Sequence, residues 1–495
     1  MKHIVLIGAG KSASFLINYL KDLTLEKNWA VTVADNDISL VKQKVGNHPK
    51  VKSLQLDIVN EIARKELIEK ADVVISMMPP HLHYLIALDC IEFSKHLLTA
   101  SYIDENIKKL QTQIEEKQLL FLCEMGLDPG IDHMSAMQMI DNIHRKGGLI
   151  TSFKSHCGGL IAPESDDNPW HYKISWNPRN IVMAGKAGAK FKMNNQIVQF
   201  PYEKIFNDCK IVQVSEQEKY AYYPNRDSLS YMPLYHLEQT PTFIRTTLRH
   251  PEFFFGWKQI VDLQLTNEEK FYQTDGMSIE NFFKLHFDKY GFNDWLHHLL
   301  NNTLNATNES ITKKAERKEP RDPIEFDADE SIMMVSKTGE LNTIQRDEIK
   351  EEKFIDVSQK IYETNLIIKQ LFFLGLADQT LINKGLCSAA EVLQFIIEQK
   401  WELKPNDQDM IVMIHEIEYI LNSKLENAKS ILKVIGENNL LTAMSKTVGL
   451  PLGIAAKLLL EDKIKMRGLH IPIDASIYTL VLKELAYHGI KFQEE

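Results

Sequence analysis

The sequence predicts an α/β fold in three parts: a parallel-sheet domain, a second α+β domain and a helical insertion domain. Three observations predict it. An apolar segment at residues 4–7 runs into Gly8-Ala9-Gly10, and a second strand ends at Asp35. Short apolar runs then alternate with charged helical segments as far as residue 123. Beyond residue 148 the strands lengthen, and mostly helical patterns follow residue 267.

The first strand, helix and strand have the pattern of a dinucleotide-binding unit. Gly8 permits a tight turn, Gly10 lets the backbone approach a pyrophosphate, and Ala13 replaces the usual third glycine. Unpaired amides at the helix N-terminus favour an anion, and Lys11 adds a positive charge. We therefore expect a Rossmann-type domain with a nicotinamide-type cofactor. A structural glycine turn in an unrelated α/β domain is the alternative.

The rest of the first domain, residues 1–147, continues this alternation. Further strands are expected at 31–34, 51–56, 73–77, 96–99 and 119–123, with exposed helices at 61–70 and 104–117. In an open parallel sheet, ligands bind beyond the carboxyl ends of the strands. The loops that carry Asp57, Met78, Ser101-Tyr102 and residues 126–130 are therefore expected to line the cofactor crevice.

The remaining chain divides by the spacing of its apolar residues. We expect an α+β domain at 148–266, a mostly helical domain at 267–403, a return to the α+β domain at 404–441 and C-terminal helices at 442–495. Expected strands lie at 151–156, 191–198, 243–249, 410–421 and 428–435, and expected helices at 442–460 and 477–488. The stretch 305–330 has too few apolar residues to offset the entropy of ordering it, so we expect a mobile, solvated insertion.

Composition excludes several functional classes. The 495 residues include 57 basic and 67 acidic side chains, and no basic stretch alternates with aromatic residues, so nucleic acid is not expected as a partner. Gly8, Gly10 and Lys11 interrupt the first apolar run, and no stretch approaches a membrane span of about 18 to 20 apolar residues. We expect a cytoplasmic protein. Five scattered cysteines are typical of reduced thiols rather than disulfides or a zinc site.

Two blocks, 123–133 and 157–176, combine Gly and Pro with polar side chains, as ligand-binding loops do. Ordinary turns are the alternative for either block alone. Asp128 follows an expected strand, where its carboxylate either holds a substrate ammonium or accepts a proton, or else caps the helix that begins near Gly130. Cys157 is either a proton donor or weak nucleophile, or a small buried hydrophobe.

Arginines further along the chain are candidates for binding carboxylates. Arg226 and Arg249 each offer paired guanidinium bonds, with surface ion pairs as the alternative. Arg249 ends an apolar strand, where it would need a partner. Asp132 and His133 suggest a metal, but no spacing places two ligands on one helical face, so no metal is expected.

Together these blocks resemble the saccharopine dehydrogenases of the glutamate-forming type, also called saccharopine reductases, over nearly the whole chain. The matching motifs are Gly8-Ala-Gly10, Thr99-Ala-Ser-Tyr102, Gly126-Leu-Asp-Pro-Gly-Ile-Asp-His133, Cys157-Gly-Gly-Leu160, Tyr172-Lys-Ile-Ser-Trp176, Tyr223-Pro-Asn-Arg-Asp-Ser228, Thr247-Leu-Arg249 and Arg467-Gly468. The resemblance implies that the α+β domain supplies the substrate site and the contacts of a homodimer, and that the helical domain closes over the cleft.

The resemblance also implies a reaction in lysine metabolism: saccharopine, NAD(P)+ and water give 2-aminoadipate 6-semialdehyde, glutamate and NAD(P)H, reversibly. By matching positions, Tyr102, Asp128 and Cys157 would surround the reacting amine, with water as a plausible direct base. The implied substrate contacts are Ser101, Tyr102, Asp128, Arg226, Thr247, Leu248 and Arg249. The implied cofactor contacts are Gly8, Gly10, Lys11, Ser12, Ala13, Asp35, Asn36, Asp57, Ile58, Met78, Ser101, Leu127 and Ser175.

One departure from the family pattern concerns the cofactor. NADP-using relatives carry an arginine after the second strand, whereas this chain has Asp35 and Asn36 there. A carboxylate bonds ribose hydroxyls but repels a 2′-phosphate, so we expect NAD, with NADP as the alternative. Two alternatives for the function are a related imine-reducing enzyme, such as carboxynorspermidine dehydrogenase or homospermidine synthase, and a non-catalytic nucleotide-binding regulatory protein.

Overall fold

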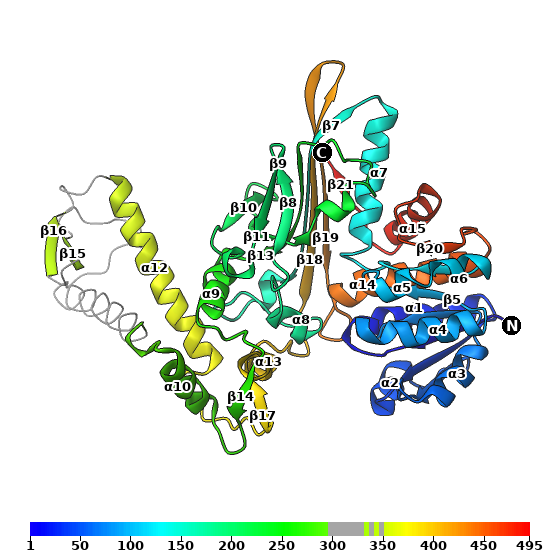
Figure 1. Cartoon of the computed structure of the whole chain (residues 1–495), viewed down its shortest axis with the longest axis horizontal. Coiled ribbons are helices and arrows are strands. Elements are labelled where there is room, and N and C mark those ends of the chain that lie inside the picture. The colour runs from blue at the N-terminus through cyan, green and yellow to red at the C-terminus, as the bar shows by residue number, and fades with distance from the viewer. Residues whose placement is uncertain (296–330, 336–340, 346–350) are drawn as a thin grey trace. The chain divides into compact units, whose positions relative to one another are not determined.

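The computed structural model describes residues 1–295, 331–335, 341–345 and 351–495, and side chains only outside 331–361. The chain forms two compact units (Figure 1). Unit 1 comprises Met1–Asp167, His171–Pro251 and Trp401–Glu495, and unit 2 comprises Asn168–Trp170 and Glu252–Lys400. The expected insertion at 305–330 lies outside the described residues.

Unit 1 contains the expected parallel sheet. Its strands are β1 (His3–Ile7), β2 (Ala30–Asp35), β3 (Val51–Gln55), β4 (Val73–Ser76), β5 (His96–Thr99), β6 (Leu120–Leu122) and β20 (Gly468–His470). Within the described chain the order is β20-β6-β5-β4-β1-β2-β3, and every pair is parallel. The Rossmann-type prediction is confirmed. The helices expected at 442–460 and 477–488 are present, and between them the same segment also supplies β20, which was not expected and which completes the sheet edge.

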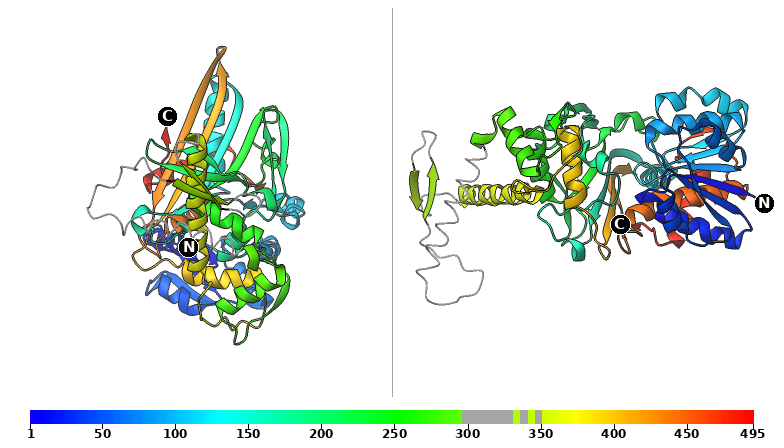
Figure 2. Two further views of the ribbon diagram at one scale, coloured as in Figure 1. Left: turned by 90° about the vertical axis from the view of Figure 1, so that its left-hand side faces the viewer. Right: turned by 90° about the horizontal axis from the view of Figure 1, so that it is seen from below.

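Helices cover both faces of this sheet (Figure 2). They are α1 (Ser14–Glu26), α2 (Ile38–Val45), α3 (Glu61–Glu69), α4 (His83–Glu92), α5 (Glu105–Lys108), α6 (Gln111–Glu116), α7 (Ile131–Arg145), α14 (Ala443–Leu460) and α15 (Ala475–Tyr487). The single helix expected at 104–117 is two short helices, α5 and α6. Helix α14 lies so close to α1 that a Cβ on Gly449 would be 2.9 Å from Leu16 Cβ.

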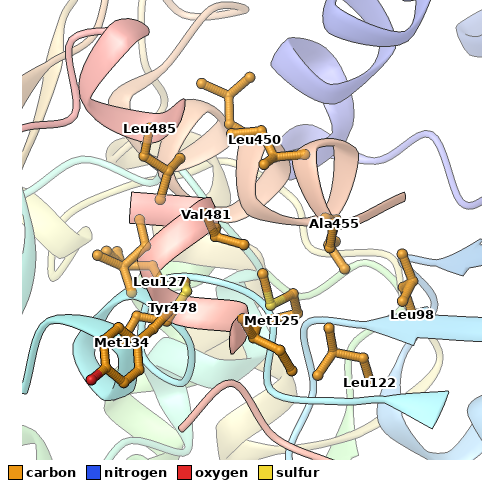
Figure 3. Packing of buried hydrophobic residues seen from close by; sticks show 14 of the residues in the cluster. Leu98, Leu122, Met125, Leu127, Met134, Leu450, Ala455, Tyr478, Val481 and Leu485 are labelled. Atoms are coloured by element: carbon orange, nitrogen blue, oxygen red, sulfur yellow. The ribbon is translucent and has the colours of Figure 1, made fainter. Parts of the chain in front are cut away.

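Helix α14 corrects one expectation from composition. Its 18 residues are long and apolar enough to cross a membrane, which the sequence analysis did not anticipate. In the fold, however, 83% of that segment is buried inside the protein. Leu450 and Ala455 of α14 pack with Tyr478, Val481 and Leu485 of α15 and with Leu127 in the core (Figure 3). Helix α14 is therefore a core helix.

The second sheet of unit 1 is mixed. Its strands are β7 (Leu149–Ile161), β8 (Ala189–Met193), β9 (Gln196–Phe200), β10 (Lys210–Gln213), β11 (Lys219–Pro224), β12 (Arg226–Asp227), β13 (Thr242–Arg249), β18 (Asp409–Leu421), β19 (Lys424–Ile435) and β21 (Gln493–Glu494). Strand β7 is parallel to β13 and antiparallel to β18. The one strand expected at 191–198 is a hairpin, because Asn194 and Asn195 adopt left-handed φ values of 48° and 63°.

Unit 2 is mostly helical. Its described elements are α9 (Pro251–Asp262), α10 (Ile279–Tyr290), α12 (Glu351–Leu374), α13 (Ala389–Lys400) and two small sheets, β14 (Lys270–Gln273) with β17 (Leu386–Ser388) and β15 (Ser331–Val335) with β16 (Leu341–Gln345). The main segment of the unit begins at Glu252, earlier than the boundary expected at 267. The reason is α9, whose Phe253 and Trp257 stack at 5.3 Å and pack inside this unit.

Candidate active site

The glycine turn after β1 has the geometry of a phosphate-binding loop. Gly8 has a φ of +104°, and a Cβ there would lie 3.0 Å from the Met77 carbonyl carbon. A Cβ on Gly10 would meet nothing within 4 Å, so that side of the loop is open. Residues Lys11–Ala13 form a short turn that leads into α1, with Ala13 buried and Lys11 exposed. The loop therefore fits a dinucleotide pyrophosphate at the helix N-terminus.

Asp35 at the end of β2 is held against this loop. Its Oδ2 accepts the Ala9 N–H at 2.7 Å, and its Oδ1 accepts the Asp37 N–H at 3.0 Å. Lys44 Nζ donates to the Gly10 carbonyl at 2.6 Å. Burial lowers the pKa of Lys44 to about 8, although Asp35 opposes that shift. A fixed carboxylate thus ends β2, where the ribose of a dinucleotide is bound in this fold.

The other expected cofactor contacts differ in what their side chains do. Ser12 and Met78 are half-buried and Asn36 is exposed. Asp57 accepts the Val59 N–H at 3.1 Å in its own turn, and Ile58 and Leu127 pack in apolar cores. Ser175 bonds the Asp409 carboxyl group. For Ile58 and Leu127, only the backbone remains to contact a cofactor.

Ser101 is tied to a histidine that the sequence analysis did not single out. His83 Nε2 lies 2.8 Å from Ser101 Oγ, and its Nδ1 lies 2.8 Å from Ser76 Oγ. Burial lowers the pKa of His83 to about 4, so the ring is neutral near pH 7. Ser76, His83 and Ser101 are therefore connected by two hydrogen bonds between uncharged groups, near the carboxyl ends of β4 and β5.

A buried arginine on β13 connects the two carboxylates that follow β6. Arg245 Nη2 lies 2.6 Å from Asp128 Oδ1 and 2.6 Å from Asp132 Oδ2. Its guanidinium carbon lies 4.4 Å from the centre of the Tyr231 ring. Arg245 is only 5% exposed. Arg249 in this strand was expected from the sequence as a site residue, whereas Arg245 was not.

The two carboxylates differ in proton affinity. Burial raises the pKa of Asp128 to about 6, against the lowering effect of Arg245. Burial also acts on Asp132, but His133, Arg245 and the Gly130 N–H together hold its pKa below the ordinary value. Asp132, not Asp128, accepts the Gly130 N–H at the start of α7, at 2.6 Å. The capping alternative for Asp128 is therefore wrong.

Tyr102 lies beside this pair. The Arg226 guanidinium carbon is 5.1 Å from the centre of the Tyr102 ring. Burial and the nearby Asp128 raise the pKa of Tyr102, so the phenol stays protonated at neutral pH. Arg226 is exposed and has a left-handed φ of 49°. Tyr102, Asp128 and Arg226 are thus brought together as the sequence analysis expected.

Cys157 completes the cluster from β7, between Thr247 of β13 and Met413 of β18. Burial, reinforced by Asp128 and Asp132, raises the pKa of its thiol well above the usual range. A protonated thiol is a poor nucleophile, so the nucleophile alternative does not fit this environment, whereas a proton donor and a small buried hydrophobe both do. Arg249 is buried on the same strand as Thr247, with its guanidinium carbon 5.0 Å from the Tyr172 ring centre.

Leu248 is an expected substrate contact whose side chain lies outside this cluster. Its side chain faces away from the Arg245 side of β13 and packs in another cluster, with Leu160 and Val412. A Cβ on Gly158 would lie 2.7 Å from Leu248 Cβ, so the two strands touch closely there. Since side chains alternate along a strand, Leu248 can contact substrate only through its backbone.

A second group of buried polar residues lies next to Asp132, around His133. His133 Nδ1 is 2.5 Å from Tyr235 Oη, and His133 Nε2 is 2.9 Å from Glu124 Oε2. Tyr231 Oη donates to the same Glu124 oxygen at 3.0 Å. Both nitrogens of the histidine are therefore engaged. In the described part of the chain no cluster of His, Cys, Asp and Glu is suited to hold a metal ion.

Two family models match the chain. The "Saccharopine dehydrogenase NADP binding domain" matches residues 4–122, and the "Saccharopine dehydrogenase C-terminal domain" matches residues 126–490.

Curated relatives and a solved structure extend the match. The Arabidopsis thaliana "Alpha-aminoadipic semialdehyde synthase" is 31% identical over 94% of this chain, which spans 40% of that relative's length. The Schizosaccharomyces pombe "Saccharopine dehydrogenase [NADP(+), L-glutamate-forming]" is 27% identical, with 100% of this chain and 99% of the relative covered. The apo saccharopine dehydrogenase (L-Glu forming) structure from Saccharomyces cerevisiae matches with a TM-score of 0.78 and 27% identity, over 100% of this chain and 99% of that one.

Proposed function

Because this chain belongs to the saccharopine dehydrogenase family, we propose that it oxidises the secondary amine of saccharopine with a nicotinamide cofactor and releases glutamate and 2-aminoadipate 6-semialdehyde. The reverse reaction forms saccharopine. The family resemblance expected from the sequence motifs is confirmed, and so is a pyridine nucleotide as the class of cofactor. One observation carries the proposal: Asp128, held by Arg245, lies beside Tyr102, Cys157 and Arg226.

The chemistry sets what these side chains must do. The nicotinamide ring, when bound, accepts a hydride from the carbon that carries the secondary amine. The amine nitrogen must first lose its proton, because a protonated amine cannot donate its lone pair to the forming C=N bond. Water then adds to the imine carbon, and the C–N bond breaks to release glutamate and the aldehyde. The site must therefore bind an anionic substrate and accept protons near neutral pH.

The cluster meets both needs. Saccharopine carries three carboxylates, and Arg226 and Arg249 supply guanidinium groups that bind carboxylates. With a pKa of about 6, Asp128 can accept the proton of the substrate amine, directly or through water, at neutral pH. Tyr102 and Cys157 keep their protons and act as donors that orient the amine and the attacking water. Binding energy from the carboxylates then positions the reacting carbon.

For the cofactor we propose NAD rather than NADP. Two backbone N–H groups hold the Asp35 carboxylate where a 2′-phosphate would be repelled. Lys44, the basic side chain beside Asp35, donates to the Gly10 carbonyl. The matched domain and the fission yeast relative are both named for NADP, so this preference would separate the chain from that relative. The ratio of kcat/KM for NAD to that for NADP tests it.

The test of the function is a substrate panel with the full chain. Saccharopine, carboxynorspermidine and lysine are each supplied with NAD and with NADP, and cofactor reduction is followed by absorbance. We expect reduction with saccharopine and not with the polyamine derivative, since the latter lacks the second and third carboxylates for Arg226 and Arg249. Reduction with carboxynorspermidine alone would replace this proposal by the polyamine alternative.

A homodimer and a cytoplasmic location, both expected from the sequence, are proposals as well. Sedimentation equilibrium of the purified chain tests the dimer, and fractionation of the source cells tests the location.

A further inference from the structure

Glu124 holds both peptide groups that flank Tyr102. It directly follows β6 and the buried Cys123, with a left-handed φ of 55°. Its backbone N–H donates to the Ser101 carbonyl at 3.0 Å. Its side-chain Oε1 accepts the Ile103 N–H at 3.2 Å. Tyr102 lies between these two bonds in a loop outside any helix or strand, so its backbone depends on one residue that follows β6.

The other oxygen of Glu124 is itself anchored. Oε2 accepts from Tyr231 Oη at 3.0 Å and lies 2.9 Å from His133 Nε2. The side chain of Glu124 is buried, and a non-glycine residue with positive φ is held only where its surroundings determine it. The anchors therefore fix the carboxyl group, and the carboxyl group fixes the loop.

The same anchors reach Asp128. His133 Nδ1 lies 3.6 Å from Asp132 Oδ2, and Asp132 shares Arg245 Nη2 with Asp128. The Tyr231 ring stacks on His133 with centres 5.1 Å apart, and it also lies under the Arg245 guanidinium. A continuous set of buried contacts thus connects the backbone of Tyr102 with the carboxyl group of Asp128.

We propose that Glu124 is a positioning residue of the amine-oxidising site, which fixes Tyr102 relative to Asp128 without touching the substrate. This inference rests on the proposed function. Both groups must face the same nitrogen, and a displacement of about 1 Å between reacting groups can reduce the rate by a factor of up to about 100. Glu124 acts through Tyr102, so its effect on the rate must depend on the Tyr102 hydroxyl.

Kinetics with saccharopine and NAD test that dependence. Glu124→Gln keeps the shape, but with a single carbonyl oxygen it cannot accept from the Ile103 N–H at one end of the side chain and from Tyr231 Oη at the other. We expect kcat to fall about tenfold, with less than about a twofold change in the affinity for NADH, since the glycine loop is untouched. In a Tyr102→Phe background, Glu124→Gln should lower kcat by much less than tenfold, because the hydroxyl group that Glu124 positions is absent. Additive losses, or a kcat equal to that of the parent chain, would overturn the proposal.

The matched control is Asp89→Asn. Asp89 is also a buried carboxylate with an ionic partner, Arg64 Nε at 2.5 Å, but it lies on α4 away from the cluster. Asp89→Asn should lower the melting temperature. It should leave kcat unchanged both in the parent chain and in the Tyr102→Phe background. A drop of kcat equal to that of Glu124→Gln would assign the Glu124 effect to lost stability and overturn the proposal.

A readout independent of turnover separates this inference from the proposed function. Hydrogen exchange measured by mass spectrometry should show faster exchange at the Ile103 amide in Glu124→Gln and Glu124→Ala than in the parent chain, and no such change in Asp89→Asn. Unchanged exchange at the Ile103 amide would overturn the positioning role of Glu124 even if the enzyme is active. If the parent chain does not oxidise saccharopine but the exchange result is as expected, the proposed function is refuted, and the hydrogen bonds by which Glu124 holds the Tyr102 loop are not.

Discussion

Arg245 donates from Nη2 to Asp128 Oδ1 at 2.6 Å, and the same nitrogen lies 2.6 Å from Asp132 Oδ2. One guanidinium nitrogen therefore serves two carboxylates in a buried site. Without it, the two negative charges would face each other, with His133 and the Gly130 N–H as the other nearby partners of Asp132. This arrangement allows Asp128 to be ionised at neutral pH.

Removing the Arg245 charge should raise the pKa of Asp128 further above about 6. For Arg245→Met we expect the acid limb of the kcat/KM profile to move to higher pH, because a second carboxylate disfavours ionisation. The buried ion pair is also broken, which costs about 3 to 5 kcal/mol of unfolding free energy. Urea denaturation measures that cost. The exposed Arg226 is the control: Arg226→Met should weaken saccharopine binding with little loss of stability.

The pH dependence of the reaction should report Asp128 directly. Because its folded pKa is about 6, the carboxylate form predominates above that pH and the neutral form below it. Proton acceptance needs the carboxylate, so kcat/KM for saccharopine oxidation should fall as the pH drops through about 6. Asp128→Asn should remove this inflection and leave the steeper dependence set by the substrate amine. An inflection that persists in Asp128→Asn would assign it to another group.

Asp35 should control the choice of cofactor. Asp35→Asn keeps an oxygen for the Ala9 N–H and removes the charge, so the kcat/KM ratio of NADP to NAD should rise by about tenfold or more, the equivalent of about 1.4 kcal/mol. Asp37→Asn is the matched control, since Asp37 is close in sequence but caps α2 through the Ser39 and Leu40 N–H groups. Equal effects of the two changes would show that the cofactor preference depends on the negative charge near the loop rather than on a contact between Asp35 and the ribose.

Cys157 should be dispensable as a nucleophile. Its buried thiol has a raised pKa, so little thiolate exists at neutral pH. Cys157→Ser retains a hydroxyl donor and should keep kcat within about tenfold of the parent value. Alkylation by iodoacetamide should reach the partly exposed Cys209 before Cys157. Complete loss of activity in Cys157→Ser would contradict the donor role.

Local patterns predicted most of the first domain because each strand there is a short apolar run that ends in a polar loop. Strand β20 could not be predicted in the same way. Gly468–His470 is only three residues long, and its partner β6 lies far away in the sequence. The hairpin of β8 and β9 did leave a signal, since paired asparagines tolerate the left-handed turn at Asn194 and Asn195.

The site was predictable in its residue types but not in its pairings. Tyr102, Asp128, Cys157 and Arg226 lie together as their loops and motifs indicated. Arg245 had a signal that was overlooked: a charged side chain two positions from Phe243 in an apolar strand must face the same buried side and needs a carboxylate. Its two carboxylate partners, Asp128 and Asp132, lie 117 and 113 residues away in the sequence, so the local pattern around Arg245 could not identify them.

The most direct test of the central claim is the product balance of one reaction. The purified full chain is incubated with saccharopine and NAD, and the NADH and glutamate formed are both quantified. We predict equal amounts of NADH and glutamate, because each hydride removed beside the amine leads to one hydrolysed imine. Formation of neither product with NAD or NADP, or of NADH without glutamate, would contradict the claim that this site oxidises and cleaves the saccharopine amine.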